Sequence, residues 1–394
     1  MIQISLEVLG DITTNNPSRM KKTLFSLIFF FLFGSVSYAG PCLTTIASAS
    51  TNQLACADDD ILNVTSTGSI TFNDHKAIDL EGISGVQITN DGTIQTEDGT
   101  NKQKAIHAES SLNTTITNNG TINSDNNEGI ILDYAENVII TNNAGATISA
   151  EGNNAISGRN VGNCHFNGAN CHSDLSGQSN GVGLTLHNYG TITSAHETIW
   201  LGSGSSGNHR SKGLKIYNYD GGIIKTTGEG DSPIKAFHVV DFEFVNYKGG
   251  TIEGADRHAV NTEQSEDINF TNHGTITAVD KSVFYCKTCP NTTFINTGTM
   301  SGGKNAVVIS HGDNISITNS GTITATTENS GLSINSSDGT VVTNTGTISG
   351  VRHGMQSSNV DNSTITNHGT ISASSNSGYG LLYENDGTNR VIIL

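Results

Sequence analysis

Hydrophobic and polar positions along this chain follow a pattern that returns at nearly regular intervals from Ile70 onward. Each copy has an apolar residue, Thr-Asn, one or two further residues and then Gly-Thr-Ile, as in Ile88 to Ile94 and Ile365 to Ile371. The closing apolar residues lie at positions 70, 94, 122, 148, 192, 224, 252, 276, 300, 323, 348 and 371. Most of the intervals between them are nearly equal, and their length is that of one solenoid coil. The repeats therefore predict about twelve coils, although the length of the chain alone suggests two or three domains.

Each coil carries a second apolar marker, such as Ala77-Ile78 or Ala306-Val307. In most coils the apolar residue of this marker and the apolar residue that opens the next Thr-Asn segment are separated by the same even number of positions, as are Ile78 and Ile88. An even separation keeps two side chains on one face of a β-strand, and helical periodicity is absent outside a segment near the N-terminus. We therefore predict an all-β fold, a single-stranded parallel β-helix of short strands joined by turns rich in Gly, Asn and Ser.

One asparagine recurs at the same point of each copy and is expected to stack with its equivalents in neighbouring coils. Coils of a β-solenoid lie about 4.8 Å apart, so identical amides can hydrogen-bond along a ladder. The glycine that follows is expected to supply a positive φ at the bend. The asparagines of this predicted ladder are Asn90, Asn118, Asn142, Asn188, Asn218, Asn246, Asn272, Asn296, Asn319, Asn344 and Asn367.

The N-terminal region resembles a signal for export. A basic start, Met20-Lys21-Lys22, precedes an apolar run from Leu24 to Phe33 and the small-x-small triplet Ser37-Tyr38-Ala39. This order predicts a signal peptide within residues 1–39, with Met20 as the true start and cleavage after Ala39. The alternative is a membrane anchor, but this apolar run has only about half the length that a bilayer requires.

Composition excludes several classes of function. The chain has 36 acidic and 19 basic side chains, a formal net charge of −17. Phosphate binding needs clustered Lys and Arg, so no nucleic-acid partner is expected. Apolar residues make up 34% of the chain, which is enough to form a core and argues against a disordered chain.

The Thr-Asn-x-Gly-Thr-Ile repeats over about residues 61–394, behind a signal peptide that begins at Met20, resemble the passenger region of Gram-negative autotransporters, the type V secretion family. The resemblance implies a right-handed parallel β-helix at the cell surface or outer membrane, or released, acting as an adhesin, enzyme carrier or virulence factor. It also implies an outer-membrane β-barrel translocator as a partner, and no barrel pattern is present in this sequence. Residues 40–60 are expected to be less regular, and the passenger to be truncated inside its last coil.

Six cysteines form three close pairs. In an exported chain closely spaced cysteines predict disulfides, and autotransporter passengers resemble this chain in that spacing. Two alternatives are a redox motif at Cys286-Lys287-Thr288-Cys289 and a zinc site from the two Cys-His dipeptides that begin at positions 164 and 171. We expect no metal and no cofactor. The predicted pairs are Cys42 with Cys56, Cys164 with Cys171, and Cys286 with Cys289.

Two adjacent coils break the constant spacing, because the stretches from Ile156 to Leu186 and from Ile199 to Ile216 are longer than their equivalents. Insertions at about 157–185 and 201–213 are therefore expected to emerge side by side as one lobe, and solenoids commonly place such loops on the binding face. A neutral, tolerated loop is the alternative. The predicted binding residues of this lobe and its base are His165, Phe166, His172, Trp200, His209 and Arg210.

Three tyrosines, Tyr189, Tyr219 and Tyr247, follow the ladder asparagine in successive coils. Stacked rings could bind a sugar or a host protein, and a purely structural aromatic ladder is the alternative.

For function, these features favour an adhesin-like rod without catalysis that binds a host-cell or matrix protein or glycan. The alternative is a carbohydrate-active enzyme similar to the pectin lyases, which share the β-helix and need converging acidic and basic groups. The best local groupings for such chemistry are Asp241 with Glu243, and Asp256 with Arg257 and His258. No nucleophile–base set or calcium-binding repeat accompanies them. The sequence therefore predicts that the chain is not an enzyme.

Overall fold

The computed structural model describes residues 40–384 and 391–393, except positions 43, 74, 98–102, 163–181, 204–209 and 229. The chain divides into two units, Met1–Ala39 and Gly40–Leu394, and the description below concerns the second. The predicted signal peptide lies outside the described residues. Within them, no helix offers the length and apolarity needed to cross a membrane.

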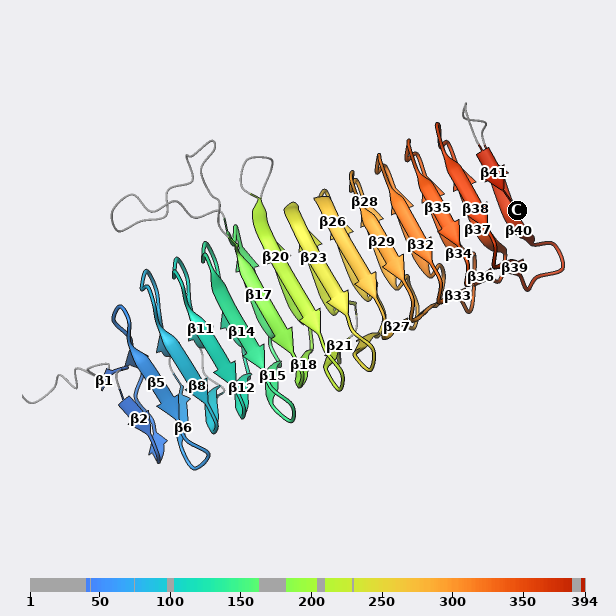
Figure 1. The fold of residues 1–394 in the computed structure, drawn as a ribbon. Coiled ribbons are helices and arrows are strands. Elements are labelled where there is room, and N and C mark those ends of the chain that lie inside the picture. The colour runs from blue at the N-terminus through green and yellow to red at the C-terminus, as the bar shows by residue number, and fades with distance from the viewer. Residues whose placement is uncertain are drawn as a thin grey trace, which may run out of the picture. The chain divides into compact units, whose positions relative to one another are not determined.

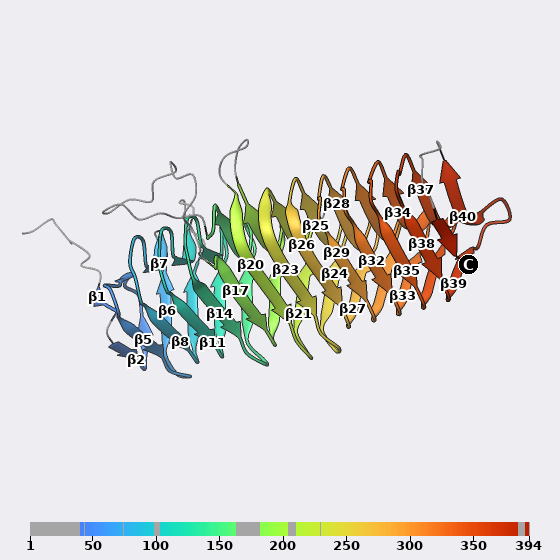
Figure 2. The same ribbon diagram turned by 45° about the horizontal axis from the view of Figure 1, so that its top comes forward.

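The described part of the chain is a β-solenoid of about twelve turns without a helix, in which three parallel sheets run side by side (Figures 1 and 2). Sheet A contains β1 (Gly40–Pro41), β4 (Leu54–Ala55), β7 (Lys76–Asp79), β10 (Lys104–His107), β13 (Ile130–Ile131), β16 (Ile156–Arg159), β19 (Ile199–Gly202), β22 (Ile234–Phe237), β25 (Val260–Glu263), β28 (Phe284–Lys287), β31 (Val307–Ser310), β34 (Ser330–Asn335), β37 (His353–Ser358) and β40 (Tyr379–Glu384).

Sheet B contains β2 (Thr44–Ile46), β5 (Ile61–Val64), β8 (Gln87–Asn90), β11 (Thr115–Asn118), β14 (Val138–Asn142), β17 (Leu184–Asn188), β20 (Ser211–Asn218), β23 (Val239–Asn246), β26 (Glu266–Asn272), β29 (Thr293–Asn296), β32 (Ser316–Asn319), β35 (Val341–Asn344), β38 (Thr364–Asn367) and β41 (Val391–Ile393). Sheet C contains β3 (Ala49–Ser50), β6 (Ser69–Phe72), β9 (Thr93–Thr96), β12 (Thr121–Ser124), β15 (Thr147–Ala150), β18 (Thr191–Ser194), β21 (Ile223–Thr226), β24 (Thr251–Gly254), β27 (Thr275–Ala278), β30 (Thr299–Gly302), β33 (Thr322–Ala325), β36 (Thr347–Gly350) and β39 (Thr370–Ala373).

Residues at equivalent positions of the sequence repeat lie opposite one another on neighbouring strands of these sheets. Ile94, Ile122 and Ile148, which close three copies, lie opposite one another on β9, β12 and β15 and are fully buried. The second marker lies in sheet A and the Thr-Asn segment in sheet B, so the constant step between them carries the chain from one sheet to the next. The predicted all-β parallel solenoid is confirmed. In the section predicted to be less regular, residues 40–60, strands β1 to β4 also pair with the following coil.

A continuous asparagine ladder runs along the turn after sheet B. In each step the Nδ2 of one asparagine donates to the Oδ1 of its equivalent in the next coil, at 2.7 to 2.9 Å. The chain of amides extends from Asn90 to Asn367, and Asn90 through Asn344 are fully buried. Because every interior asparagine side chain both donates and accepts a hydrogen bond, these buried amides are paired with one another and need no water.

In the short turns, where one residue separates the ladder asparagine from the glycine, the glycine has a different role from the predicted positive φ. A Cβ at Gly120 would lie 2.0 Å from the carbonyl oxygen of Gly92, and one at Gly298 would lie 2.2 Å from that of Gly274. Neither glycine has a positive φ. In the longer turns, where two residues separate the ladder asparagine from the glycine, the predicted positive φ is present, as at Gly145 (φ 82°). The short turns need glycine because successive coils approach too closely for a side chain.

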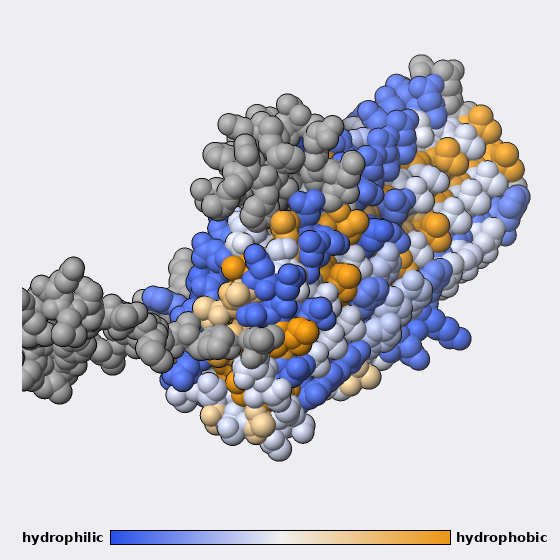
Figure 3. Space-filling model, turned by 60° about the vertical axis from the view of Figure 1, so that its left-hand side comes forward, coloured by the Kyte–Doolittle hydropathy of each residue, from blue (hydrophilic) through white to orange (hydrophobic). Residues whose placement is uncertain are grey.

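The core is a narrow row of inward side chains, aromatic in the middle coils. Phe244 and Phe294 each stack on Phe270 with ring centroids 5.0 Å apart, and all three are fully buried. On the face drawn in Figure 3, hydrophobic residues form separate patches among hydrophilic ones.

The structure contains disulfides between Cys42 and Cys56 and between Cys286 and Cys289, two of the three predicted pairs. The third pair, Cys164 and Cys171, lies outside the described residues. Disulfides in loops this short agree with an oxidising compartment.

Candidate functional site

A row of outward-facing side chains crosses five neighbouring strands of sheet A. The residue before each of them, for example Ile199 or Phe284, points into the core and is buried, so pleating turns the next one outward. The row spans four strand spacings, about 19 Å. Its members are Ser157 on β16, Trp200 on β19, Lys235 on β22, Asn261 on β25 and Tyr285 on β28, which lie in direct register.

Two depressions lie along this row, and together we call them the sheet A groove. The Trp200 pocket, of about 330 Å³, is lined by Glu128, Ile131, Asp133, Asn154, Ser157, Arg159, Glu197 and Trp200. The Tyr285 pocket, of about 310 Å³, is lined by Glu197, Gly230, Asp231, Ser232, Lys235, Arg257, His258, Asn261, Glu263 and Tyr285. Glu197 lines both pockets, so they meet at its side chain.

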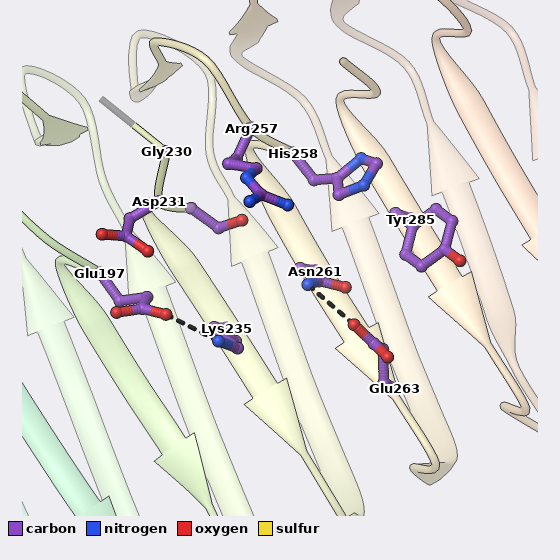
Figure 4. Close-up of a pocket in the computed structure, with 10 residues that line it drawn as sticks. Glu197, Gly230, Asp231, Lys235, Arg257, His258, Asn261, Glu263 and Tyr285 are labelled. Atoms are coloured by element: carbon purple, nitrogen blue, oxygen red, sulfur yellow. Dashed lines mark hydrogen bonds and ion pairs between the residues drawn. The ribbon is translucent and has the colours of Figure 1, made fainter. Parts of the chain in front are cut away.

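The strands and the turns before them contribute different groups to the Tyr285 pocket (Figure 4). Lys235, Asn261 and Glu263 stand on the strands, whereas Asp231 and Arg257 come from the turns that lead into β22 and β25. Lys235 Nζ donates to Oε1 of Glu197 at 2.7 Å. Asn261 Nδ2 donates to Oε1 of Glu263 at 3.1 Å. Two carboxylates are thereby fixed by neighbouring side chains within one polar pocket.

At one side of this pocket, His258 stacks on Tyr285 with ring centroids 4.3 Å apart. The backbone N–H of Ser282 donates to His258 Nδ1 at 3.3 Å. Burial, followed by the nearby charges of Lys281 and Arg257, lowers the pKa of His258 to about 4. At neutral pH the ring is therefore uncharged, and with Nδ1 accepting, Nε2–H remains a donor. Burial and then Glu263 raise the pKa of Tyr285, so its hydroxyl also stays protonated.

An ion pair between the buried carboxylate of Asp133 and the half-exposed side chain of Arg159 shapes the Trp200 pocket. Asp133 is only 1% exposed and accepts from the backbone N–H of Arg159 at 2.8 Å and from its Nε at 2.7 Å. The guanidinium also pairs with Asp133 through Nη2. Trp200, the chain's single tryptophan, is partly buried on the neighbouring strand and offers the pocket an aromatic surface.

Two clusters among the described residues have metal-ligand types close together, but their atoms are already engaged. One cluster combines Cys42 and Cys56, which form a disulfide, with Asp60. The other combines Asp79, Glu81 and His107. There Lys76 Nζ donates to both carboxylates, at 3.0 to 3.2 Å, and His107 Nδ1 lies 3.0 Å from Asp79. Lysine occupies the position that a cation would take.

The structure separates the binding residues predicted for the insertion lobe. Trp200 lies in the sheet A groove, whereas Arg210 pairs with Glu266 of sheet B at 2.5 Å. The strands that flank both insertions lie side by side, β16 with β19 and β17 with β20, so both insertions leave the same corner of neighbouring coils. The remaining predicted residues, His165, Phe166, His172 and His209, lie outside the described residues.

The three tyrosines form the expected stack, at the corner between sheets B and C. Tyr189 and Tyr219 have ring centroids 4.2 Å apart, and Tyr219 and Tyr247 lie 4.8 Å apart, with interplanar angles of 7° and 6°. Burial, with the neighbouring tyrosines, raises the pKa of Tyr219 to about 12. Because the rings cover one another's faces, the interior of the stack has no free face for a sugar.

Of the two groupings read from the sequence, one lies partly in the groove and the other lies outside it. Arg257 and His258 line the Tyr285 pocket, whereas Asp256, the carboxylate of the same grouping, is not among the lining residues. Asp241 and Glu243 belong to sheet B, where Asp241 adopts the left-handed turn conformation (φ 58°) that Asp267 in the next coil also adopts. Glu243 lies 3.9 Å from Lys215 on the neighbouring strand.

Sequence reasoning missed most of the groove. Its members lie far apart along the chain, and only their common position reveals them: each follows the apolar residue of the second marker. Reading that column alone gives Ser157, Trp200, Lys235, Asn261 and Tyr285, a set richer in polar and aromatic groups than its continuation in Val308 and Ser333.

No protein-family model matches this sequence, and no curated protein matches it. Two solved structures are similar, both catalytic domains of a GH87 alpha-1,3-glucanase in complex with nigerose. They are 11% and 12% identical, with TM-scores of 0.28 and 0.27. Each alignment covers 90% of this chain, which spans 62% of the length of the matched chain.

The prediction that the chain is not an enzyme is contradicted by these matches, because both are catalytic domains, and it is withdrawn. At 11% and 12% sequence identity, the similarity between these structures and this chain is a similarity of fold alone. The resemblance to autotransporter passengers has no support from a family match.

Proposed function

We propose that this chain is an exported carbohydrate-active protein whose sheet A groove binds a glycan chain along the solenoid and cleaves it. The observation that carries the proposal is the register of Trp200, Lys235, Asn261 and Tyr285, with carboxylates from neighbouring coils beside them. The groove is elongated along the stacking direction of the strands, as a site for a polymer must be.

The side chains of the groove are those that sugars require. Sugar hydroxyls donate to carboxylate and amide oxygens and accept from Lys, Arg and neutral His, and all of these groups line the pockets. The apolar face of a sugar ring packs on aromatic side chains, which Trp200 and Tyr285 supply toward the two ends of the row.

Cleavage of a glycosidic bond needs two carboxyl groups, one to protonate the leaving oxygen and one to act as base or nucleophile. Glu197 lies where the two pockets meet, and Lys235 fixes one of its oxygens. Its Oε2 is the atom we assign to the reacting bond. Asp231 and Glu263, which line the same pocket, are the candidates for the second carboxyl group.

We also propose export to the surface or outside of a Gram-negative bacterium, as a passenger served by an outer-membrane β-barrel translocator. The short disulfide loops at Cys42–Cys56 and Cys286–Cys289 support export. An adhesin-like role, with a host-cell or matrix protein or glycan as the partner, is the second candidate. It is favoured by the position of both insertions, which follow β16 and β19, the strands that line the Trp200 pocket.

The test is the release of reducing ends by the purified full chain from a panel of soluble neutral and acidic polysaccharides. We expect release from at least one of them, and a loss of about 100-fold or more, of the order seen when acid–base groups are removed, in Glu197→Gln. Glu243→Gln is the matched control, because Glu243 also lies near a lysine on an outward strand face but outside the groove. Absence of release across the panel, or equal release by Glu197→Gln, would overturn the catalytic proposal.

A further inference from the structure

Three buried acceptor atoms in the sheet A groove lack a donor among the described residues. They are Oε2 of Glu128, Oδ1 of Asn154 and Oδ1 of Asn261. The asparagines are 7% and 9% exposed. Asn154 and Glu128 line the Trp200 pocket, and Asn261 lines the Tyr285 pocket, so each pocket has at least one such acceptor.

An unsatisfied buried acceptor is costly, and a water, an ion or a ligand that donates to it removes that cost. Acceptors of this kind are complementary to donors such as sugar hydroxyls. They repel carboxylate, sulfate and phosphate groups, which bring further acceptors and negative charge.

The charge of the groove points the same way. Its lining has five carboxylates and three permanent cations, so 3 − 5 gives a formal charge of −2, with His258 neutral. Two of the cations are already paired, Lys235 with Glu197 and Arg159 with Asp133. An acidic polymer would therefore meet a net negative groove in which a single cation, Arg257, has no ion pair among the described residues.

We propose that the sheet A groove selects an uncharged polysaccharide and holds one sugar unit on each side of Glu197. The unit in the Trp200 pocket donates hydroxyls to Asn154 and Glu128, and the unit in the Tyr285 pocket donates one to Asn261. This inference rests on the proposed function and specifies its substrate class.

Calorimetric titration of the full chain, in the cold where turnover is slow, tests it. The probes are uncharged gluco-oligosaccharides of α- and β-linkage and oligogalacturonates of the same length. We expect at least one neutral series to bind, and the oligogalacturonates to bind at least tenfold more weakly at low ionic strength, where repulsion is least screened.

Variants separate the inference from the proposed function. Asn154→Ala and Asn261→Ala should each weaken neutral binding roughly fivefold, the value of one hydrogen bond. Asn335→Ala, on the same sheet but outside the groove, is the control and should bind like the wild type. Wild-type affinity in both groove variants, or equal or tighter binding of oligogalacturonates, would overturn the inference while leaving a glycan groove. If neither probe binds, the proposed function falls with it.

Discussion

Val64 lies opposite Asn90 in the parallel register, and Oδ1 of Asn90 consequently has no donor among the described residues. Every later member of the ladder accepts from the asparagine before it. Replacing the asparagine at the end of the ladder should therefore lower the free energy of unfolding less than replacing one in its interior.

Asn218→Val should lower the free energy of unfolding by about 2 to 4 kcal/mol, because it removes the donor to Asn246 and the acceptor for Asn188. Asn90→Val moves the end of the ladder by one coil and should cost less than about 1 kcal/mol. Urea unfolding followed by circular dichroism measures both. Equal losses would show that the amides do not act as a connected ladder.

Arg159→Ala should destabilise the chain by about 1 to 3 kcal/mol, since it leaves the nearly inaccessible Asp133 carboxylate without its guanidinium. The estimate stays at the low end for buried pairs because the Arg159 side chain is 54% exposed. Lys215→Ala, which removes a partner of Glu243 in a pair with both side chains 38% exposed, should cost under about 0.5 kcal/mol. A smaller loss for Arg159→Ala than for Lys215→Ala would contradict the account.

His258 should make stability fall as pH decreases from about 6.5 to about 4. Its folded pKa of about 4 lies below the ordinary value of 6.5, so in this window the unfolded chain binds a proton that the folded chain does not. This stabilisation is fully present above pH 6.5 and is lost as the pH falls toward about 4, and its slope stays under about 1.4 kcal/mol per pH unit because only one proton is exchanged. His258→Asn preserves an acceptor for the Ser282 N–H and should flatten the profile. An unchanged slope in this variant would remove His258 as its source.

The repeated part of the structure could be predicted from sequence, and the unrepeated part could not. Ile94 and Asn90 have equivalents in coil after coil, so their spacing alone fixes which residues face inward and which stack. The stack of Tyr189, Tyr219 and Tyr247 was predictable for the same reason. Repetition turns local spacing into three-dimensional register.

The groove is formed where residues at one register position of sheet A differ in type from coil to coil. Trp200, Lys235 and Asn261 have nothing in common as a motif, and they meet only because β19, β22 and β25 stack. Glu197 and Asp231 come from turns whose length varies, so spacing does not align them. The prediction of no catalysis weighed only residues that converge within single coils, whereas a solenoid can bring side chains together across coils.

The most direct measurement of the central claim, that the sheet A groove binds a glycan chain, is the fluorescence of Trp200 during titration with polysaccharides. Because Trp200 is the chain's single tryptophan and lines the groove, its emission reports occupancy without a label. We predict a saturable change with an uncharged polysaccharide, weakened in Asn261→Ala and retained in Asn335→Ala. An emission that stays constant while calorimetry records binding would place the glycan elsewhere on the solenoid and contradict the account.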